Sequence, residues 1–202
     1  MQWIAVILAA GFSTRMGRCK AGLSHPDSQT LLSYQIEQWQ RANFWPIVIL
    51  GEHNAADHGL CLPADQIVVN SDPNAGKTHS IRLGLAALPP ECSVVAIAAV
   101  DQPRPSALYQ ELLAAHQSQE NLVTVPTYNG KLGHPILFST ELLPRLHQIT
   151  EETKGLRQVI TEMAYHLGRV EVATPEILVD LNTPGAYQDY LRCWQQQDTS
   201  EL

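Results

Sequence analysis

A cluster of positive charge follows the first apolar run of the chain, in the segment LAAGFSTRMGRCK at residues 8–20. Arg15, Arg18 and Lys20 lie there, and no acid occurs before Asp27, although the 202-residue chain has a formal net charge of -7. Backbone N–H groups of a loop built from small residues can hold phosphate oxygens, and Arg and Lys add charge. These residues therefore indicate a site for a phosphate-like anion, with a polar surface loop as the alternative.

Asp101 is a second candidate, because it directly follows the apolar run SVVAIAAV at residues 93–100. A lone carboxylate at the end of an apolar strand is costly unless solvent or a partner surrounds it. Proteins usually hold Mg²⁺ with one or two carboxylates, together with phosphate oxygens and water. Asp101 is therefore a candidate metal ligand, and a carboxylate that caps a strand-end turn is the alternative.

Strand-like and helix-like runs alternate up to about residue 125. Strands are expected at residues 2–8, 46–50, 66–69, 93–100 and 121–126, and helices at residues 30–42, 80–88 and 105–117. This alternation predicts an α/β fold, a Rossmann-like and mostly parallel sheet flanked by helices. Ligands of such sheets bind beyond the carboxyl ends of the strands, where both candidate segments begin.

The pattern changes after residue 126. An Asn-Gly pair at residues 129–130 predicts a hairpin, and the rest of the chain predicts helices at 139–149, 155–167 and 183–194 and short strands at 168–173 and 177–179. We interpret residues 1–202 as a single domain. Its α/β portion spans residues 1–125, and a small C-terminal lobe at residues 126–202 folds back over it.

Composition excludes several classes of function. The net charge and a sequence pI of about 5.5 argue against a nucleic-acid or anionic-membrane partner. The four cysteines are widely spaced without a C-x-x-C pair, which is typical of reduced thiols rather than a zinc or redox motif. The first apolar run has about half the length needed to cross a bilayer. We therefore expect a cytoplasmic protein.

The segment at residues 8–20 resembles the signature L-A-[AG]-G-x-[SG]-x-R-M-G-x-x-K of the MobA/MocA-type nucleotidyltransferases, which include the molybdenum-cofactor cytidylyltransferases. The resemblance implies a nucleotide-diphospho-sugar transferase-like fold, in which this loop wraps the triphosphate of an NTP. The nucleotide contacts it implies are Leu8, Ala9, Ala10, Gly11, Ser13, Arg15 and Lys20. Arg15 and Lys20 would also be catalytic, as phosphate contacts.

A second segment, NSDPNAGKTHSIRLGL at residues 70–85, is similar to the family pattern N-x-x-W-x-x-G-x-x-x-S-[LI]-x-x-G-L, which lies near the base and ribose. The matching nucleotide contacts are Asn70, Gly76 and Ser80. Pro73 replaces the usual Trp, and Lys77 stands where Met or Leu is common. A plain loop and helix start, with Ser80 as a cap, is the alternative.

The resemblance also implies a metal site and an acceptor site. VDQP at residues 100–103 matches the family's metal-binding segment, and VDLNTPGAY at residues 179–187 matches a segment that approaches the metal. Asp101, as a catalytic metal ligand, and Asp180 would bind Mg²⁺, with Asn182 nearby; helix capping by Asn182 or Thr183 is the alternative. GHPILF at residues 133–138 is close to the cytidylyl branch and implies that His134 contacts the acceptor's phosphate.

The implied reaction is Mg²⁺-dependent transfer of CMP from CTP to the phosphate of molybdopterin, the molybdenum cofactor, with release of pyrophosphate. The Ala-Ala-Gly entry at residues 9–11 is typical of the cytidylyl branch, while the guanylyl branch has Ala-Gly-Gly. A molybdenum hydroxylase or its chaperone would receive the product. Guanylyl transfer to the same cofactor, transfer to a sugar phosphate, and a non-catalytic nucleotide-binding regulator remain as alternatives.

Overall fold

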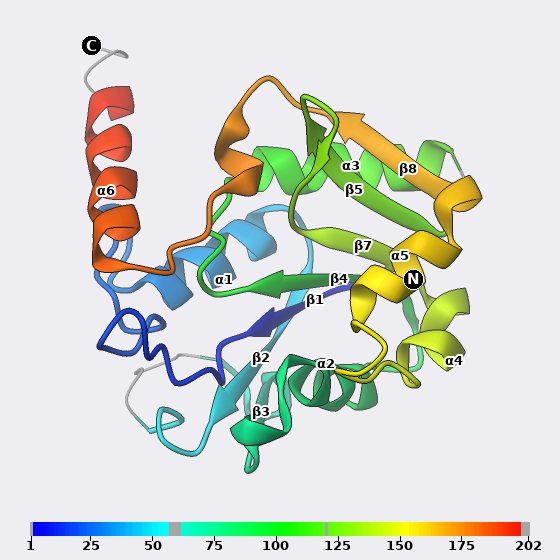
Figure 1. The fold of residues 1–202 in the computed structure, drawn as a ribbon, viewed down its shortest axis with the longest axis horizontal. Helices are drawn as coiled ribbons and strands as arrows, with labels where there is room; N and C mark the ends of the chain where they lie inside the picture. Colours follow the sequence, from blue (N-terminus) through cyan, green and yellow to red (C-terminus); the bar gives the residue numbers. More distant parts are fainter. Residues whose placement is uncertain (1, 57–61, 120, 199–202) are drawn as a thin grey trace.

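The computed structural model describes residues 2–56, 62–119 and 121–198. Over these residues, eight strands form one mixed sheet in the order β3-β2-β1-β4-β7-β5-β6, with β8 beside β5 (Figure 1). The strands are β1 (Gln2–Leu8), β2 (Trp45–Gly51), β3 (Ile67–Asn70), β4 (Cys92–Ala99), β5 (Val123–Tyr128), β6 (Lys131–Leu132), β7 (Ile136–Ser139) and β8 (Leu167–Glu171). The expected fold, a mostly parallel sheet flanked by helices, is confirmed.

Two strands run against the parallel direction. β1 pairs in parallel with β2 and β4, and β5 pairs in parallel with β8, whereas β7 lies antiparallel between β4 and β5. β6 forms the predicted hairpin with β5, and Asn129 and Gly130 adopt positive φ angles of 49° and 74° at its tip. The chain after residue 125 thus adds β6, β7 and β8 to the sheet that the earlier strands begin.

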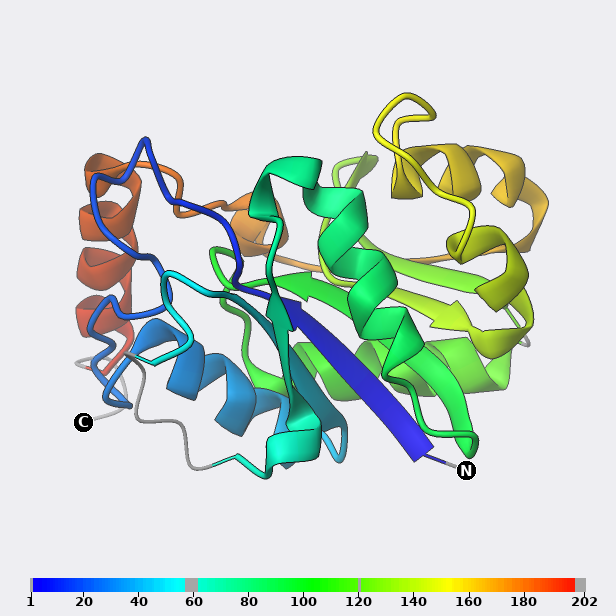
Figure 2. The same ribbon diagram turned by 90° about the horizontal axis from the view of Figure 1, so that it is seen from below.

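Helices cover both faces of the sheet, which explains why β1 is a continuous apolar run. Ala5 and Ile7 pack with α1 and α3 in one cluster, and Ile4 and Val6 pack with α2 in another. Figure 2 shows α1 and α3 on one side of the sheet and α2 on the other. The helices are α1 (Leu31–Arg41), α2 (Lys77–Ala86), α3 (Ser106–Ser118), α4 (Leu143–Leu146), α5 (Leu156–Glu162) and α6 (Pro184–Asp198).

The predicted strand at residues 177–179 is wrong. A 3₁₀ turn occupies Pro175–Leu178, and Ile177 is buried against Gly133. The carbonyl of Ile177 accepts a hydrogen bond of 3.2 Å from the N–H of His134, so this backbone secures a turn and joins no strand ladder. No helix in the described residues is both long and apolar enough to cross a membrane.

α6 stands at one end of the molecule, beside the loop that follows β1 (Figures 1 and 2). The ring of His25 in that loop stacks on Tyr34 at 3.7 Å, and its Nε2 lies 2.8 Å from Oη of Tyr190 in α6. The N–H of Asp27 donates to Nδ1 of His25 at 3.1 Å, so the ring proton lies on Nε2 and faces Tyr190. Burial lowers the pKa of His25 to about 4, against a smaller opposing effect of Asp27.

The close packing of α2 on β1 can be tested at Gly84. A Cβ atom there would lie 2.4 Å from Cγ1 of Val6 and 3.3 Å from Cδ1 of Ile49. Gly84→Ala should therefore lower the free energy of unfolding by about 1–3 kcal/mol, measured by urea denaturation. Gly185→Ala is the matched control, because a Cβ atom added at Gly185 would lie 4.0 Å from its nearest neighbour, Oγ1 of Thr183. That variant should be neutral or stabilise the protein by about 0.5–1 kcal/mol. Equal effects of the two substitutions would contradict this packing.

The attachment of α6 through His25 should depend on pH. The folded pKa of about 4 lies below the ordinary value of 6.5, so the unfolded chain binds the proton first as the pH falls. The contribution of His25 to stability is complete above pH 6.5 and decreases toward pH 4, by roughly 1 kcal/mol per pH unit. His25→Phe should flatten the pH dependence of the unfolding free energy. His147→Phe, at an exposed position, should leave the pH dependence of the unfolding free energy unchanged. The same pH dependence in the wild type and in both variants would contradict the prediction.

Candidate functional site

The two candidate segments begin side by side at the carboxyl ends of β1 and β4. Leu8 is the register partner of Ala99, and the N–H of Val100 donates to the carbonyl of Leu8 at 3.0 Å. The buried Asn54 donates from Nδ2 to the carbonyl of Ala9 at 2.9 Å. The sheet and this side chain thus determine where the loop starts and bring it to the strand end that carries Asp101.

The loop at residues 9–20 winds around Ser13. Ser13 has a positive φ of 55°, its carbonyl accepts from the N–H groups of Met16 and Gly17, and its Oγ accepts from the N–H of Lys20 at 3.2 Å. Within the described part of the chain, the N–H groups of Gly11, Phe12 and Thr14 donate to no other residue. The loop is therefore closed by its own hydrogen bonds at Ser13 and keeps exposed amides that an anion could accept from.

Lys20 lies between two oxygen atoms from distant parts of the chain. Its Nζ is 2.7 Å from Oδ2 of Asp101 and 2.7 Å from Oδ1 of Asn182. The Lys20 and Asp101 side chains are only 11% and 19% exposed. Arg15 also donates to Oδ1 of Asn182, at 3.0 Å. A cation from the loop after β1 and a carboxylate from the end of β4 are therefore in direct contact.

The segment at residues 179–182 reaches this cluster because hydrogen bonds attach it to the residues that follow β4. The N–H of Leu181 donates to the carbonyl of Asp101 at 2.8 Å, and Gln102 donates to Oδ1 of Asp180 at 2.8 Å. The Oγ1 of Thr183 accepts the N–H of Ala186 and caps α6. The capping alternative thus holds for Thr183, and Asn182 is left to contact Lys20.

Arg104 completes this attachment and was not foreseen from the sequence. It is 2% exposed, and its guanidinium donates to the carbonyls of Pro103 and Val179 at 2.7 Å each. Burial lowers the pKa of Arg104, opposed by Tyr109 and Asp180. The only signal for Arg104 is its position three residues after Asp101, which does not indicate its distant partner.

A cavity of about 280 Å³ opens between the loop after β1, the end of β4 and the start of α2. The site residues predicted from the sequence that line it are Leu8, Ala9, Ala10, Gly11, Ser13, Lys20, Gly76, Ser80 and Asp101. Arg15, Asn70 and Asp180 lie outside this lining. The buried Asn70 donates to Oγ of Ser80 at 2.9 Å and accepts the N–H of Asp72 at 2.8 Å, so it positions the wall of the cavity.

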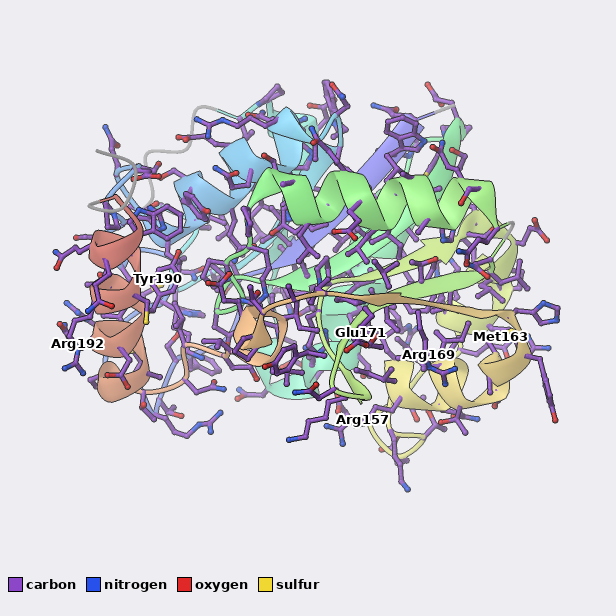
Figure 3. The ribbon with its side chains drawn as sticks, turned by 90° about the horizontal axis from the view of Figure 1, so that it is seen from above. Arg157, Met163, Arg169, Glu171, Tyr190 and Arg192 are labelled. Atoms are coloured by element: carbon purple, nitrogen blue, oxygen red, sulfur yellow. The ribbon has the colours of Figure 1, made fainter. Side chains whose placement is uncertain are left out.

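A larger cavity of about 730 Å³ lies on the other side of the start of α2. Its apolar lining comes from Ile81, Val125, Leu132, Ile136, Leu156 and Ile160, and its charged side chains are three cations, Lys77, Lys154 and Arg157, and one acid, Glu151. Figure 3 shows Arg157, from the first turn of α5, on the face of the sheet opposite α3. This combination suits an anion that carries an apolar body.

His134 lines the larger cavity and is separate from the smaller one. Burial lowers the pKa of His134 to about 4, and the positive charge of Lys77 acts in the same direction. The ring is therefore neutral near pH 7. It can exchange hydrogen bonds with a ligand but brings no positive charge to it.

Glu151 fastens the C-terminal part of the chain to α2. Its Oε1 accepts from the N–H of Thr78 at 2.8 Å and from Oγ1 of Thr78 at 3.0 Å. A Cβ atom at Gly76, where φ is 93°, would lie 2.5 Å from the same oxygen. The sequence shows Glu151 only as one of two adjacent acids, so this cap was missed.

The described residues contain no group of three or more His, Cys, Asp or Glu side chains that could hold a metal ion by itself. The oxygens of Asp101 and Asn182 nevertheless converge on one positive charge, the ammonium of Lys20. One carboxylate and one amide oxygen form an incomplete set of hard oxygen donors. Such a set fits a Mg²⁺ ion that takes its remaining ligands from phosphates and water.

Solved structures with similar folds cover nearly the whole chain. Rv0371c from Mycobacterium tuberculosis H37Rv is 25% identical, with a TM-score of 0.80 over 95% of this chain and 98% of that one. A structure of Rv0371c in complex with manganese has a TM-score of 0.76 at 24% identity, over 95% and 98%. The nucleotidyl transferase Mth528 from Methanothermobacter has a TM-score of 0.78 at 20% identity, over 97% and 99%.

A more distant structure, CMP:2-keto-3-deoxy-manno-octonic acid synthetase complexed with CTP, has a TM-score of 0.72 at 12% identity, over 98% of this chain and 100% of that one. The comparison with curated protein sequences finds no match. The family model of the MobA-like NTP transferase domain matches residues 5–169. With a loop of exposed amides, a lysine and a carboxylate gathered at one cavity, the chain belongs to the MobA-like NTP transferase family of nucleotidyltransferases.

Proposed function

We propose that this nucleotidyltransferase transfers CMP from CTP to the phosphate of a molybdopterin-type cofactor and releases pyrophosphate. One observation carries the proposal: Lys20, Asp101 and Asn182 converge at the wall of the 280 Å³ cavity, and the 730 Å³ cavity adjoins it at the start of α2. The smaller cavity would take the nucleotide and the larger one the acceptor. Such an arrangement supports a reaction between two bound anions.

Lys20 and Arg15 would hold the phosphates of the nucleotide, together with the exposed N–H groups of Gly11 and Phe12. The acceptor's phosphate monoester is largely ionised near neutral pH, because its second pKa is about 6. One of its oxygens attacks the α-phosphorus, the bond from that phosphorus to the bridging oxygen breaks, and pyrophosphate leaves. The reaction then needs no general base, and the protein contributes positioning and charge neutralisation.

Asp101 would hold Mg²⁺ together with the amide oxygen of Asn182, and Asp180 would be a second carboxylate. Asp180 accepts from Gln102 through one oxygen, and this bond orients its carboxylate next to the residues after β4. The ion would offset the negative charge that gathers on the phosphates. The solved manganese complex of Rv0371c supports a divalent ion in this fold.

The nucleotide preference rests on Ala10. Ala10 is 3% exposed and lines the smaller cavity, where its methyl group would take space that a larger purine base needs. The structural neighbour solved with CTP is consistent with a cytidine nucleotide in this fold. We therefore propose CTP as the donor.

The acceptor preference rests on the larger cavity. Its mostly apolar lining suits the flat ring system of a pterin better than the hydroxyl groups of a sugar. The neutral ring of His134 would exchange a hydrogen bond with the acceptor's phosphate. A molybdenum hydroxylase or its chaperone would then receive the cytosine dinucleotide form of the cofactor.

Pyrophosphate release with purified molybdenum cofactor tests this function. The wild-type protein with Mg²⁺ should respond to CTP and not to GTP, ATP or UTP. Lys20→Met and Asp101→Asn should each lower kcat/KM by about a hundredfold or more, because each removes one charged group at the reacting phosphates. Lys131→Met, at an exposed position outside both cavities, should retain wild-type kinetics.

A response to GTP alone would overturn the choice of nucleotide. Turnover with a sugar phosphate but not with the cofactor would overturn the choice of acceptor. Pyrophosphate release that survives Lys20→Met unchanged would contradict the role of Lys20. Circular dichroism of each variant would show that a loss of activity does not come from unfolding.

A further inference from the structure

Lys77 is the residue that the two cavities share, among the described residues that line them. It is the first residue of α2 and follows Gly76, whose positive φ of 93° turns the chain into the helix. The smaller cavity continues from it toward Lys20 and Asp101, and the larger one toward His134 and α5. Lys77 therefore lies at the boundary where two bound molecules would meet.

The ammonium of Lys77 is available to a ligand. The side chain is exposed, and it makes no hydrogen bond or ion pair with the other described residues. Lys20, by contrast, is engaged with Asp101 and Asn182. Glu151 also lines the larger cavity, and its Oε1 accepts from Thr78 and not from Lys77.

The charge of Lys77 acts on the cavity that it faces. It is one of the groups that lower the pKa of His134, which places its positive charge within electrostatic reach of that ring. Lys154 and Arg157 lie on another wall of the larger cavity, on the loop and helix after Glu151. Among the cations of the larger cavity, Lys77 is therefore the one that also faces the nucleotide cavity.

A solvated surface lysine is the simpler interpretation, and the position argues against it. Lys77 places its charge where the helix start separates two cavities. The attacking phosphate oxygen and the α-phosphorus must approach within about 3–3.5 Å, and the repulsion between the two anions opposes this approach. A cation at the boundary can bind the acceptor's phosphate and lower that cost.

We propose that Lys77 is a specificity-determining residue that binds the phosphate monoester of the acceptor at the boundary between the two cavities. The proposal rests on the proposed function, because it assigns the larger cavity to an acceptor. It adds that this chain selects acceptors with a phosphate monoester dianion over acceptors that offer a hydroxyl. The attacking oxygen belongs to that phosphate, and Lys77 offsets its charge as the new bond to the α-phosphorus forms.

The test compares Lys77→Met with Arg82→Met. Both substitutions remove an exposed cation from α2, and Met has a helix propensity close to that of Lys and Arg, but Arg82 lines neither cavity. The first probe is 4-methylumbelliferyl phosphate, an aromatic phosphate monoester whose binding is followed by fluorescence polarisation. The second probe is CTP with Mg²⁺, followed by calorimetry.

Lys77→Met should weaken binding of the aromatic phosphate about tenfold or more, the loss expected for one charge-assisted hydrogen bond. It should change CTP affinity by less than about threefold, since Lys20 and the loop amides remain. Arg82→Met should match the wild type with both probes. In turnover assays, Lys77→Met should raise the KM of the phosphorylated acceptor much more than that of CTP.

Three outcomes would overturn the inference: no binding of the aromatic phosphate to the wild type, unchanged binding to Lys77→Met, or an equal loss in Arg82→Met. A loss of CTP binding as large as the loss of phosphate binding would show that Lys77 does not distinguish the acceptor from the nucleotide, and would also overturn the inference. The two binding measurements need no turnover. A wild-type protein that binds both probes but makes no cytosine dinucleotide would therefore contradict the proposed function and leave the role of Lys77 supported.

Discussion

The contact of Lys20 with Asp101 and Asn182 joins three distant parts of the chain at one point. Lys20 comes from the loop after β1, Asp101 from the end of β4, and Asn182 from the segment before α6. A partly buried ion pair adds little net stability, because desolvation of the charges offsets their attraction. Its value here is positional. It holds the ammonium of Lys20 and the carboxylate of Asp101 next to each other at a cavity wall. There, bound phosphates could pair with Lys20 and a metal ion could pair with Asp101.

Several other contacts in the fold hold Lys20, Asp101 and Asn182 in place. The paired ends of β1 and β4 align the two segments, and Ser13 closes the loop so that Lys20 points back to the sheet. The buried Arg104 attaches the segment before α6. Each of these supports lies in the core or in a hydrogen-bonded loop. The cavity that results is lined by residues with hydrogen-bonded or core supports, an arrangement that would suit catalysis by positioning.

The start of α2 separates the two cavities and is held by both halves of the chain. Asn70 supports it through Ser80, and Glu151 caps it through Thr78. Lys77 lies between these supports and faces both cavities. The same few residues thus connect the side of the molecule where a nucleotide would bind to the side where an acceptor would bind. A change at this helix start would act on both.

The sequence by itself determined the parallel α/β fold, because buried strands and amphipathic helices have distinct periodicities. It also predicted the loop at residues 8–20 and Asp101 as site candidates, because charge after an apolar strand is a local signal. Tertiary structure alone decided which partners meet. Four features join residues far apart in the sequence: the insertion of β7 between β4 and β5, the hydrogen bond from Lys20 to Asn182, the cap by Glu151 and the hydrogen bond from Arg104 to Val179. Such contacts leave no periodic pattern, since they depend on how the elements pack and not on the order of neighbouring residues.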